Sequence, residues 1–97
     1  IVADRDDPSK LLVRSRAKGD IERVCEHAKV EHTPNADYLY RARISRSRVI
    51  AAMQSEIESI DYDNFKNSVP EHDRHDAYLA CWSVMHGWQK ARSRGKP

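Results

Sequence analysis

The chain has only three glycines, and this scarcity excludes several kinds of nucleotide-binding site. Gly19, Gly87 and Gly95 each stand alone, so no glycine-rich loop could cradle a phosphate and no dinucleotide fingerprint is present. No run of hydrophobic residues approaches the roughly 18 that a membrane span needs. The 97 residues are 39% hydrophobic and 33% charged. We therefore expect a single folded domain, residues 1–97, with a modest core and no membrane partner.

Cysteine is equally scarce. The chain has Cys25 and Cys81, far apart in sequence, and no CxxC or other metal-type spacing. Each lies among apolar residues in a helical pattern, which favours buried free thiols in a reducing compartment and hence a cytoplasmic protein. The alternatives are one disulfide or a reactive thiol.

Alternating and turn-forming residues predict two β-hairpins. The chain begins with Ile1 rather than Met, and we expect a few residues of a first strand to precede it. The stretch of turn-forming residues from Asp4 to Lys10 joins that strand to the next, and a Pro-Asn turn joins the second pair. The predicted strands comprise residues 1–3, 11–16, 30–33 and 38–44.

Apolar residues at helical spacing predict three helices. Asp20 is the expected N-cap of the first, and Ser45 or Ser47 that of the second. The expected fold class is α+β, a small antiparallel sheet of two hairpins with about three helices packed on one face. Residues 90–97 are predicted to form a flexible basic tail. Trp82, Tyr62 and Phe65 are expected in the core. The apolar positions of the three helices are, in order, Ile21, Val24, Cys25 and Ala28; Ile50, Met53, Ile57 and Ile60; and Tyr78, Leu79, Trp82, Met85 and Trp88.

Charge is unevenly distributed although the net charge is only +2. Residues 1–48 carry 11 basic and 8 acidic groups, residues 49–76 carry 2 and 7, and residues 77–97 carry 4 and none. Arginine, which binds phosphate or carboxylate through two parallel hydrogen bonds, supplies 11 of the 17 basic groups. The distribution favours a surface that binds a partner.

Strand alternation gathers several arginines on one predicted face. Arg14 and Arg16 share a face of one strand, and Arg41 and Arg43 share a face of another. If the two strands are neighbours, four guanidiniums line the sheet face opposite the helices, with Arg46, Arg48 and Lys18 at its rim. Such a face could follow a phosphate backbone or bind an acidic protein. Alternatively, the arginines simply solvate the outer face of a single-layer sheet.

Aromatic residues qualify this interpretation. Tyr38 and Tyr40 are predicted on the opposite face, so the alternation of basic and aromatic residues found on RNA-binding sheets is missing. Trp88 is interpreted as a core-edge residue, or as part of a partner or dimer surface beside the basic tail.

Residues that could support catalysis or metal binding are few. His72 and His75, at i and i+3, could share a helix face with Asp76 as a third ligand. Acidic residues at a helix start need no metal, however, because they favour the helix dipole. The segment from Asp61 to Asn64 lacks the ligand and glycine that a calcium loop requires at the next two positions. We expect no catalytic residue, no metal, no cofactor and no enzyme activity.

Three motifs resemble a group of small uncharacterised proteins of tailed phages and their bacterial hosts. They are Asp37-Tyr38-x-Tyr40-Arg41, then Asp61-Tyr62-x-Asn64-Phe65-Lys66, then His75-Asp76-Ala77-Tyr78 leading to Trp82-Ser83-Val84-Met85. The resemblance implies a phage or prophage accessory protein acting in the host cytoplasm. It implies no activity and transfers no functional residue.

The favoured hypothesis is a non-enzymatic protein-binding module that engages a host or phage protein. Its binding residues would be Arg14, Arg16, Arg41, Arg43, Arg46, Arg48 and Trp88. The alternative is a nucleic-acid-binding accessory protein that uses the arginine-rich sheet face and the basic tail. A metal enzyme centred on His72 and His75 is the third hypothesis. The sequence leaves the oligomeric state open, including a homodimer.

Overall fold

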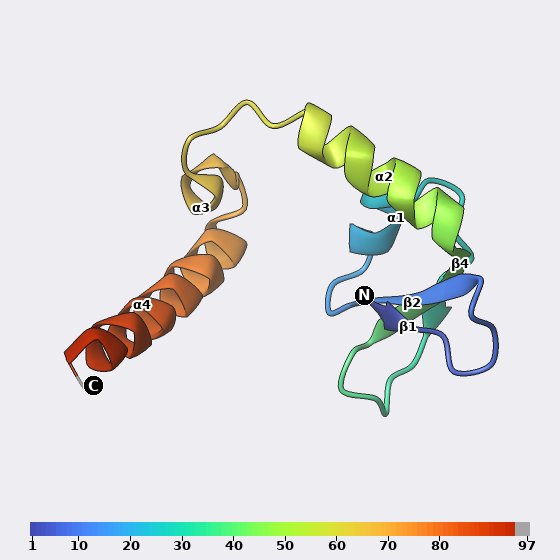
Figure 1. Cartoon of the computed structure of the whole chain (residues 1–97), viewed down its shortest axis with the longest axis horizontal. Helices are drawn as coiled ribbons and strands as arrows, with labels where there is room; N and C mark the ends of the chain where they lie inside the picture. Colours follow the sequence, from blue (N-terminus) through green and yellow to red (C-terminus); the bar gives the residue numbers. More distant parts are fainter. Residues whose placement is uncertain (95–97) are drawn as a thin grey trace. The chain divides into compact units, whose positions relative to one another are not determined.

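The structure is a computed structural model that describes residues 1–94 (Figure 1). It confirms the predicted α+β class. Four strands form one antiparallel sheet in the order β1-β2-β4-β3. The elements in chain order are β1 (Val2–Ala3), β2 (Lys10–Ser15), α1 (Asp20–Val24), β3 (Glu31–His32), β4 (Tyr40–Ser45), α2 (Arg46–Glu58), α3 (Phe65–Ser68) and α4 (His72–Arg94).

The chain divides into two compact units, Ile1–Ile60 and Asp61–Pro97. The first unit holds the sheet with α1 and α2, and the second holds α3 and α4. The predicted tail, residues 90–97, is helical as far as Arg94, and its last three residues lie outside the described part of the chain.

Both predicted hairpins are present in the sheet. β1 pairs with β2 across the turn from Asp4 to Ser9, where the Asp7 carboxylate accepts bonds from the Ser9 amide at 2.9 Å and hydroxyl at 2.7 Å. A carboxylate that bonds the backbone two residues on is typical of such a turn. β3 pairs with β4 in the second hairpin, and β2 pairs with β4 to join the two.

The core of the first unit lies between one sheet face and the two helices. Val13, Ala42 and Ile44 alternate on the inner side of β2 and β4, where they meet residues of α1 and α2. Strand alternation places the intervening residues on the outer face. The buried set comprises Val13, Ile21, Cys25, Ala42, Ile44 and Val49.

The first helix begins differently from the prediction. Gly19, not Asp20, is the N-cap of α1, and its φ of 91° is a left-handed conformation that favours glycine. Asp20 is the first helical residue, where a carboxylate favours the helix dipole. For α2 the cap is Ser45, whose hydroxyl accepts from the Arg48 amide at 3.4 Å.

The buried side of α2 was predicted incorrectly. The expected stripe included Ile50 and Ile57, but these are 60% and 68% exposed, whereas Val49 is 3% exposed. Ala52 and Met53 join Val49 against the core, which is the same helical spacing shifted by one residue.

In the second unit the predicted core residues are not buried. Trp82 is 52% exposed and Phe65 is 53% exposed, and Tyr62 is also exposed. Cys81 is an exposed free cysteine, whereas Cys25 is the buried free thiol that was predicted.

Candidate anion-binding face of the sheet

The register of β2 with β4 brings two arginines directly opposite each other. Arg14 pairs with Arg41, and Leu12 pairs with Arg43 two residues along. These residues alternate with the buried Val13 and Ala42, so they lie on the outer face of the sheet. The strands that carry the arginines are therefore neighbours.

A tyrosine holds two of the guanidiniums in place. The guanidinium carbon of Arg14 lies 4.6 Å from the centroid of the Tyr38 ring, and that of Arg16 lies 4.3 Å from it. Arg16 also donates from Nη1 to the backbone carbonyl oxygen of Asp37 at 3.1 Å. Cation–π contacts of this kind favour a fixed position for both positive charges.

The prediction that Tyr38 lies on the opposite face from the arginines is wrong. Strand β4 begins at Tyr40, so strand alternation does not extend back to Tyr38. Tyr38 instead lies in the loop before the strand, where its amide donates to the Asp37 carboxylate at 3.0 Å. Tyr40 does lie on the inner face, stacked on His32 with ring centroids 5.1 Å apart.

Arg14 and Arg41 have little compensation for their charge. The closest carboxylate to Arg41 in an ion pair is that of Asp37, at 4.0 Å, and it is largely solvent-exposed. Within residues 1–94, no ion pair joins Arg14 or Arg16 to a carboxylate. The Nε atoms of Arg14 and Arg41 are buried without a hydrogen-bond partner. Such unpartnered donors are costly unless a ligand or water accepts from them.

Arg43, in contrast, is neutralised within the chain. Its Nε and Nη2 donate to the two carboxylate oxygens of Asp4 at 2.9 and 2.7 Å, a bidentate pair. The hydrogen bonds from Arg43 hold the pKa of Asp4 below its ordinary value, and Asp4 in turn raises the pKa of Arg43. Of the predicted row of four arginines, Arg14 and Arg16 thus have no carboxylate partner in the described part of the chain, Arg41 has a 4.0 Å contact with Asp37, and Arg43 forms a bidentate ion pair. We call Arg14, Arg16 and Arg41, together with Tyr38, the arginine cluster.

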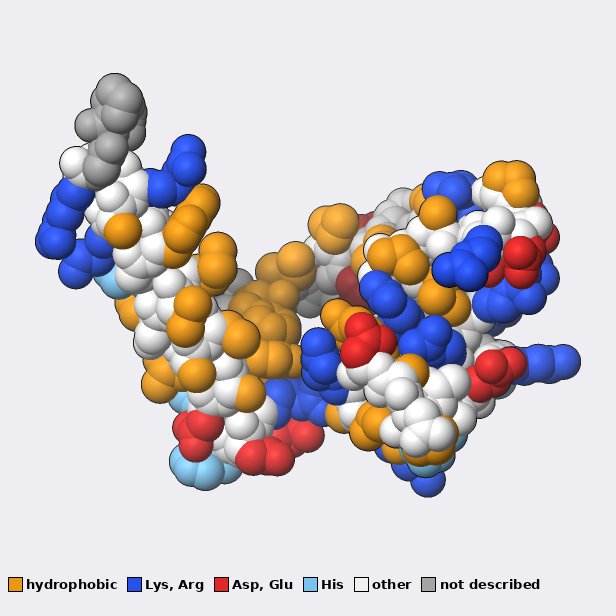
Figure 2. Space-filling model, turned by 90° about the horizontal axis from the view of Figure 1, so that it is seen from below, with side chains coloured by type: hydrophobic (Ala, Val, Ile, Leu, Met, Phe, Trp, Pro, Cys, Tyr) orange, Lys and Arg blue, Asp and Glu red, His pale blue; other side chains and the backbone are white. Residues whose placement is uncertain are grey.

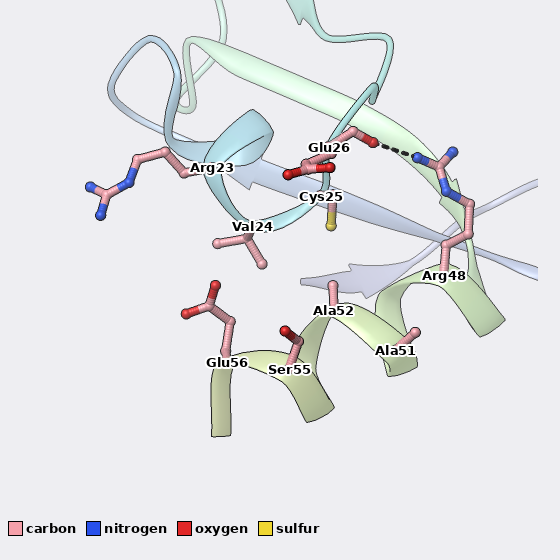
Figure 3. A pocket seen from close by; sticks show the side chains of 9 residues that line it. All are labelled: Arg23, Val24, Cys25, Glu26, Arg48, Ala51, Ala52, Ser55 and Glu56. Atoms are coloured by element: carbon pink, nitrogen blue, oxygen red, sulfur yellow. Dashed lines mark hydrogen bonds between the residues drawn. The ribbon is translucent and has the colours of Figure 1, made fainter. Parts of the chain in front are cut away.

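The two predicted rim arginines bind backbone carbonyls. Arg46 donates from Nε to the carbonyl of Pro8 at 3.3 Å. Arg48 donates from Nη2 to the carbonyl of Glu26 at 2.7 Å and lines a pocket between α1 and α2, as Figure 3 shows. Because these helices cover the inner face, Arg48 does not lie beside the arginine cluster.

That pocket has a volume of about 450 Å³ and is open to solvent. The Cys25 side chain points toward it from the C-terminal end of α1, while Ser55 and Glu56 line it from α2 (Figure 3). Burial raises the pKa of the Cys25 thiol. A protonated thiol is a poor nucleophile, so the pocket gives no support for covalent catalysis.

The remaining predicted residues belong to the second unit. Trp88 is 56% exposed on α4, and the guanidinium carbon of Arg92 lies 5.2 Å from its ring centroid. His72 pairs with Asp76 at 3.4 Å, while His75 lies 3.2 Å from the Asn67 side-chain oxygen. Residues 1–94 contain no cluster of three His, Cys, Asp or Glu side chains suited to a metal ion.

Sequence reasoning missed the acidic and aromatic members of this face. Asp4 and Asp37 lie in loops, and Tyr38 precedes its strand by two residues. For Asp37 and Tyr38 the one available signal was their position just before a predicted strand, and that signal is weak. The sequence contains no signal for Asp4.

Comparisons with known proteins find no matching family model, no matching curated protein and no matching solved structure. Among the described helices, none has the length and apolar character required to cross a bilayer.

Proposed function

We propose that this protein is a non-enzymatic protein-binding module whose arginine cluster binds an acidic segment of a partner protein. The observation that carries the proposal is the near absence of compensating charge. The guanidiniums of Arg14 and Arg16 pack on one tyrosine ring and Arg41 pairs in register with Arg14. Within the described residues, the one ion pair among these three arginines joins Arg41 to Asp37 at 4.0 Å. Carboxylates of a partner would supply the missing acceptors.

The cluster is organised before any partner arrives. Tyr38 holds Arg14 and Arg16, and the strand pairing fixes the backbone of Arg41 opposite Arg14. Holding flexible side chains in place reduces the entropy lost on binding.

The carboxylates near the cluster favour a short anionic segment over a long anionic chain, because they repel any anion that extends beyond Arg14, Arg16 and Arg41. Asp4 occupies Arg43, and Glu31 pairs in register with Arg41 at the sheet edge. A nucleic-acid backbone gains affinity by neutralising many successive phosphates, and these acidic side chains interrupt such a path. A short acidic segment needs only the local cluster.

The cellular setting of the proposal rests on the motif resemblance alone. A phage or prophage accessory protein in a bacterial cytoplasm would meet host proteins with acidic segments. We include that setting in the proposal, together with a host or phage protein as the partner.

Fluorescence anisotropy with labelled probes tests the proposal. The probes are a short peptide of alternating glutamate and serine, its glutamine counterpart, single-stranded DNA, double-stranded DNA and RNA. We expect micromolar binding of the glutamate peptide only. Arg14→Gln/Arg41→Gln should weaken it at least about tenfold, because it removes two charge-assisted contacts.

The matched control is Arg23→Gln/Lys29→Gln, which removes the same charge from exposed residues outside the cluster and should bind like the natural protein. Equal loss in both variants would mean general charge attraction and would refute the assigned site. Preferential nucleic-acid binding, falling steeply between about 50 and about 200 mM salt, would establish the alternative function. No binding of any probe would refute both functions of the cluster.

A further inference from the structure

Helix α4 presents an apolar side that its own unit leaves exposed. None of its residues, His72–Arg94, is buried, and Met85 and Trp88 are 59% and 56% exposed. Figure 2 shows hydrophobic side chains along the length of this helix. A helix in water gains most of its stability from packing its apolar side, and an extended apolar patch typically marks an interface.

The apolar residues follow the seven-residue repeat of helices that pair with each other. Tyr78 and Met85 are seven residues apart, as are Cys81 and Trp88, and each member of the second pair follows the first by three. This alternation of three and four places all four on one narrow stripe. The short helix α3 widens it, because Phe65 stacks on Tyr78 with ring centroids 5.4 Å apart.

The two ends of the helix carry opposite charge. Glu71, Asp73 and Asp76 lie at its start, against only Arg74, whereas Lys90, Arg92 and Arg94 lie at its end without an acidic residue. Two such helices side by side in the same direction would bring like charges together. The antiparallel arrangement brings acidic and basic ends together and also opposes the helix dipoles favourably.

We propose that this side of α4 is a dimer interface occupied by α4 of a second copy of the chain, in antiparallel orientation. The register that buries the most apolar stripe places Tyr78 opposite Trp88 and Cys81 opposite Met85. The contact is the same on both copies, so the assembly closes as a dimer.

In this register two arginines of different copies lie close together, and a neighbouring glutamate offsets their repulsion. Arg74 lies at the level of Arg92 of the second copy. The Arg74 Nε lies 3.2 Å from a Glu71 carboxylate oxygen, and less than one helical turn separates Glu71 from that level. Glu71 can therefore bridge both arginines.

Sedimentation equilibrium of the full chain tests the dimer. We expect twice the monomer mass for the natural protein and a monomer for Met85→Glu, since that variant places a charge in the stripe. The matched control is Ser83→Glu, which adds the same charge to the opposite side of the helix and should remain dimeric. Circular dichroism checks that each variant is folded. A monomeric natural protein, or equal loss of dimer in both variants, would refute the proposal.

Cysteine cross-linking with a mild oxidant tests the orientation. In the antiparallel register Met85→Cys places a thiol opposite Cys81 of the second copy, so this variant should form a disulfide-linked dimer efficiently. Cys81 alone, or Met85→Cys in a Cys81→Ser background, should cross-link poorly because like positions are offset by about 6 Å along the helix axis. Efficient cross-linking of either single thiol would indicate parallel helices and would overturn the proposed orientation.

Discussion

At the residue scale, the ion pair between Asp4 and Arg43 decides how many charges the outer sheet face offers. It joins the β1–β2 turn to β4 through two hydrogen bonds, and the Asp4 side chain is only 7% exposed. Because Arg43 is bound to Asp4, the arginine cluster of Arg14, Arg16 and Arg41 is what the outer face offers to a ligand. The same pair also links stability to pH.

Replacing Asp4 by Asn should reduce the acid sensitivity of the fold. The folded-state pKa of Asp4 lies below its ordinary value of 3.8 because Arg43 donates to the carboxylate. A carboxyl with a lowered folded pKa contributes stability above its unfolded pKa, and this contribution is lost as pH falls through the folded pKa. Asp7, whose pKa the Ser9 bonds lower, contributes in the same direction.

Urea unfolding of both proteins between about pH 6 and about pH 2 measures this effect. We expect the natural protein to be more stable than Asp4→Asn at the upper end, with the difference shrinking as pH falls below 3.8. A pH-independent difference would contradict the assigned role of the carboxylate charge. Asp6→Asn is the control, since it removes a nearby carboxylate that makes no ion pair with Arg43.

At the element scale, α2 shows how two overlapping patterns can mislead a sequence analysis. Ile50, Met53 and Ile57 form one helical stripe, and Val49, Ala52 and Met53 form another beside it. The larger side chains favour the first, but the structure buries the second. Periodicity alone does not specify which of two overlapping stripes faces the sheet.

The burial of α2 predicts a large difference between two neighbouring substitutions. Val49→Ala should lower the free energy of unfolding by about 1.5 to 2 kcal/mol, because it removes two buried methyl groups. Ile50→Ala should change it by less than about 0.5 kcal/mol, since Ile50 is 60% exposed. Chemical denaturation of both variants checks the comparison. The reverse order would mean that the first stripe is the packed one.

At the scale of the whole molecule, the sequence was sufficient for the fold class, both hairpins and the shared face of the strand arginines. Alternation placed Arg14 and Arg41 on the side away from Val13 and Ala42, and the register confirms it. The contribution of Tyr38 could not be predicted, because a loop positions it. The exposed Trp82 and Cys81 were missed because helical spacing identifies an apolar side but not what covers it.

On the outer sheet face, the arginines that would bind a partner lower the stability of the isolated chain. Arg14 and Arg41 lie directly opposite each other, and like charges in that position destabilise a sheet. Their buried Nε atoms without partners add to the cost. A sequence selected for stability alone would place an acidic or neutral residue at one of the two positions.

Arg41→Gln should therefore stabilise the isolated protein while it weakens binding. Relief of the repulsion by Arg14 favours the variant, whereas loss of the cross-strand neighbour Glu31 and of the 4.0 Å contact with Asp37 opposes it. Both of these acidic partners are exposed, so their loss costs little. We therefore expect a net gain of at most about 0.5 kcal/mol in the free energy of unfolding at low salt. The gain should shrink at about 1 M salt, where charges are screened within about 3 Å. Paired measurements of unfolding and of glutamate-peptide binding check both effects. A variant that loses stability and binding together would show that Arg41 supports the fold, whereas opposite changes would show that the repulsion is retained for the partner.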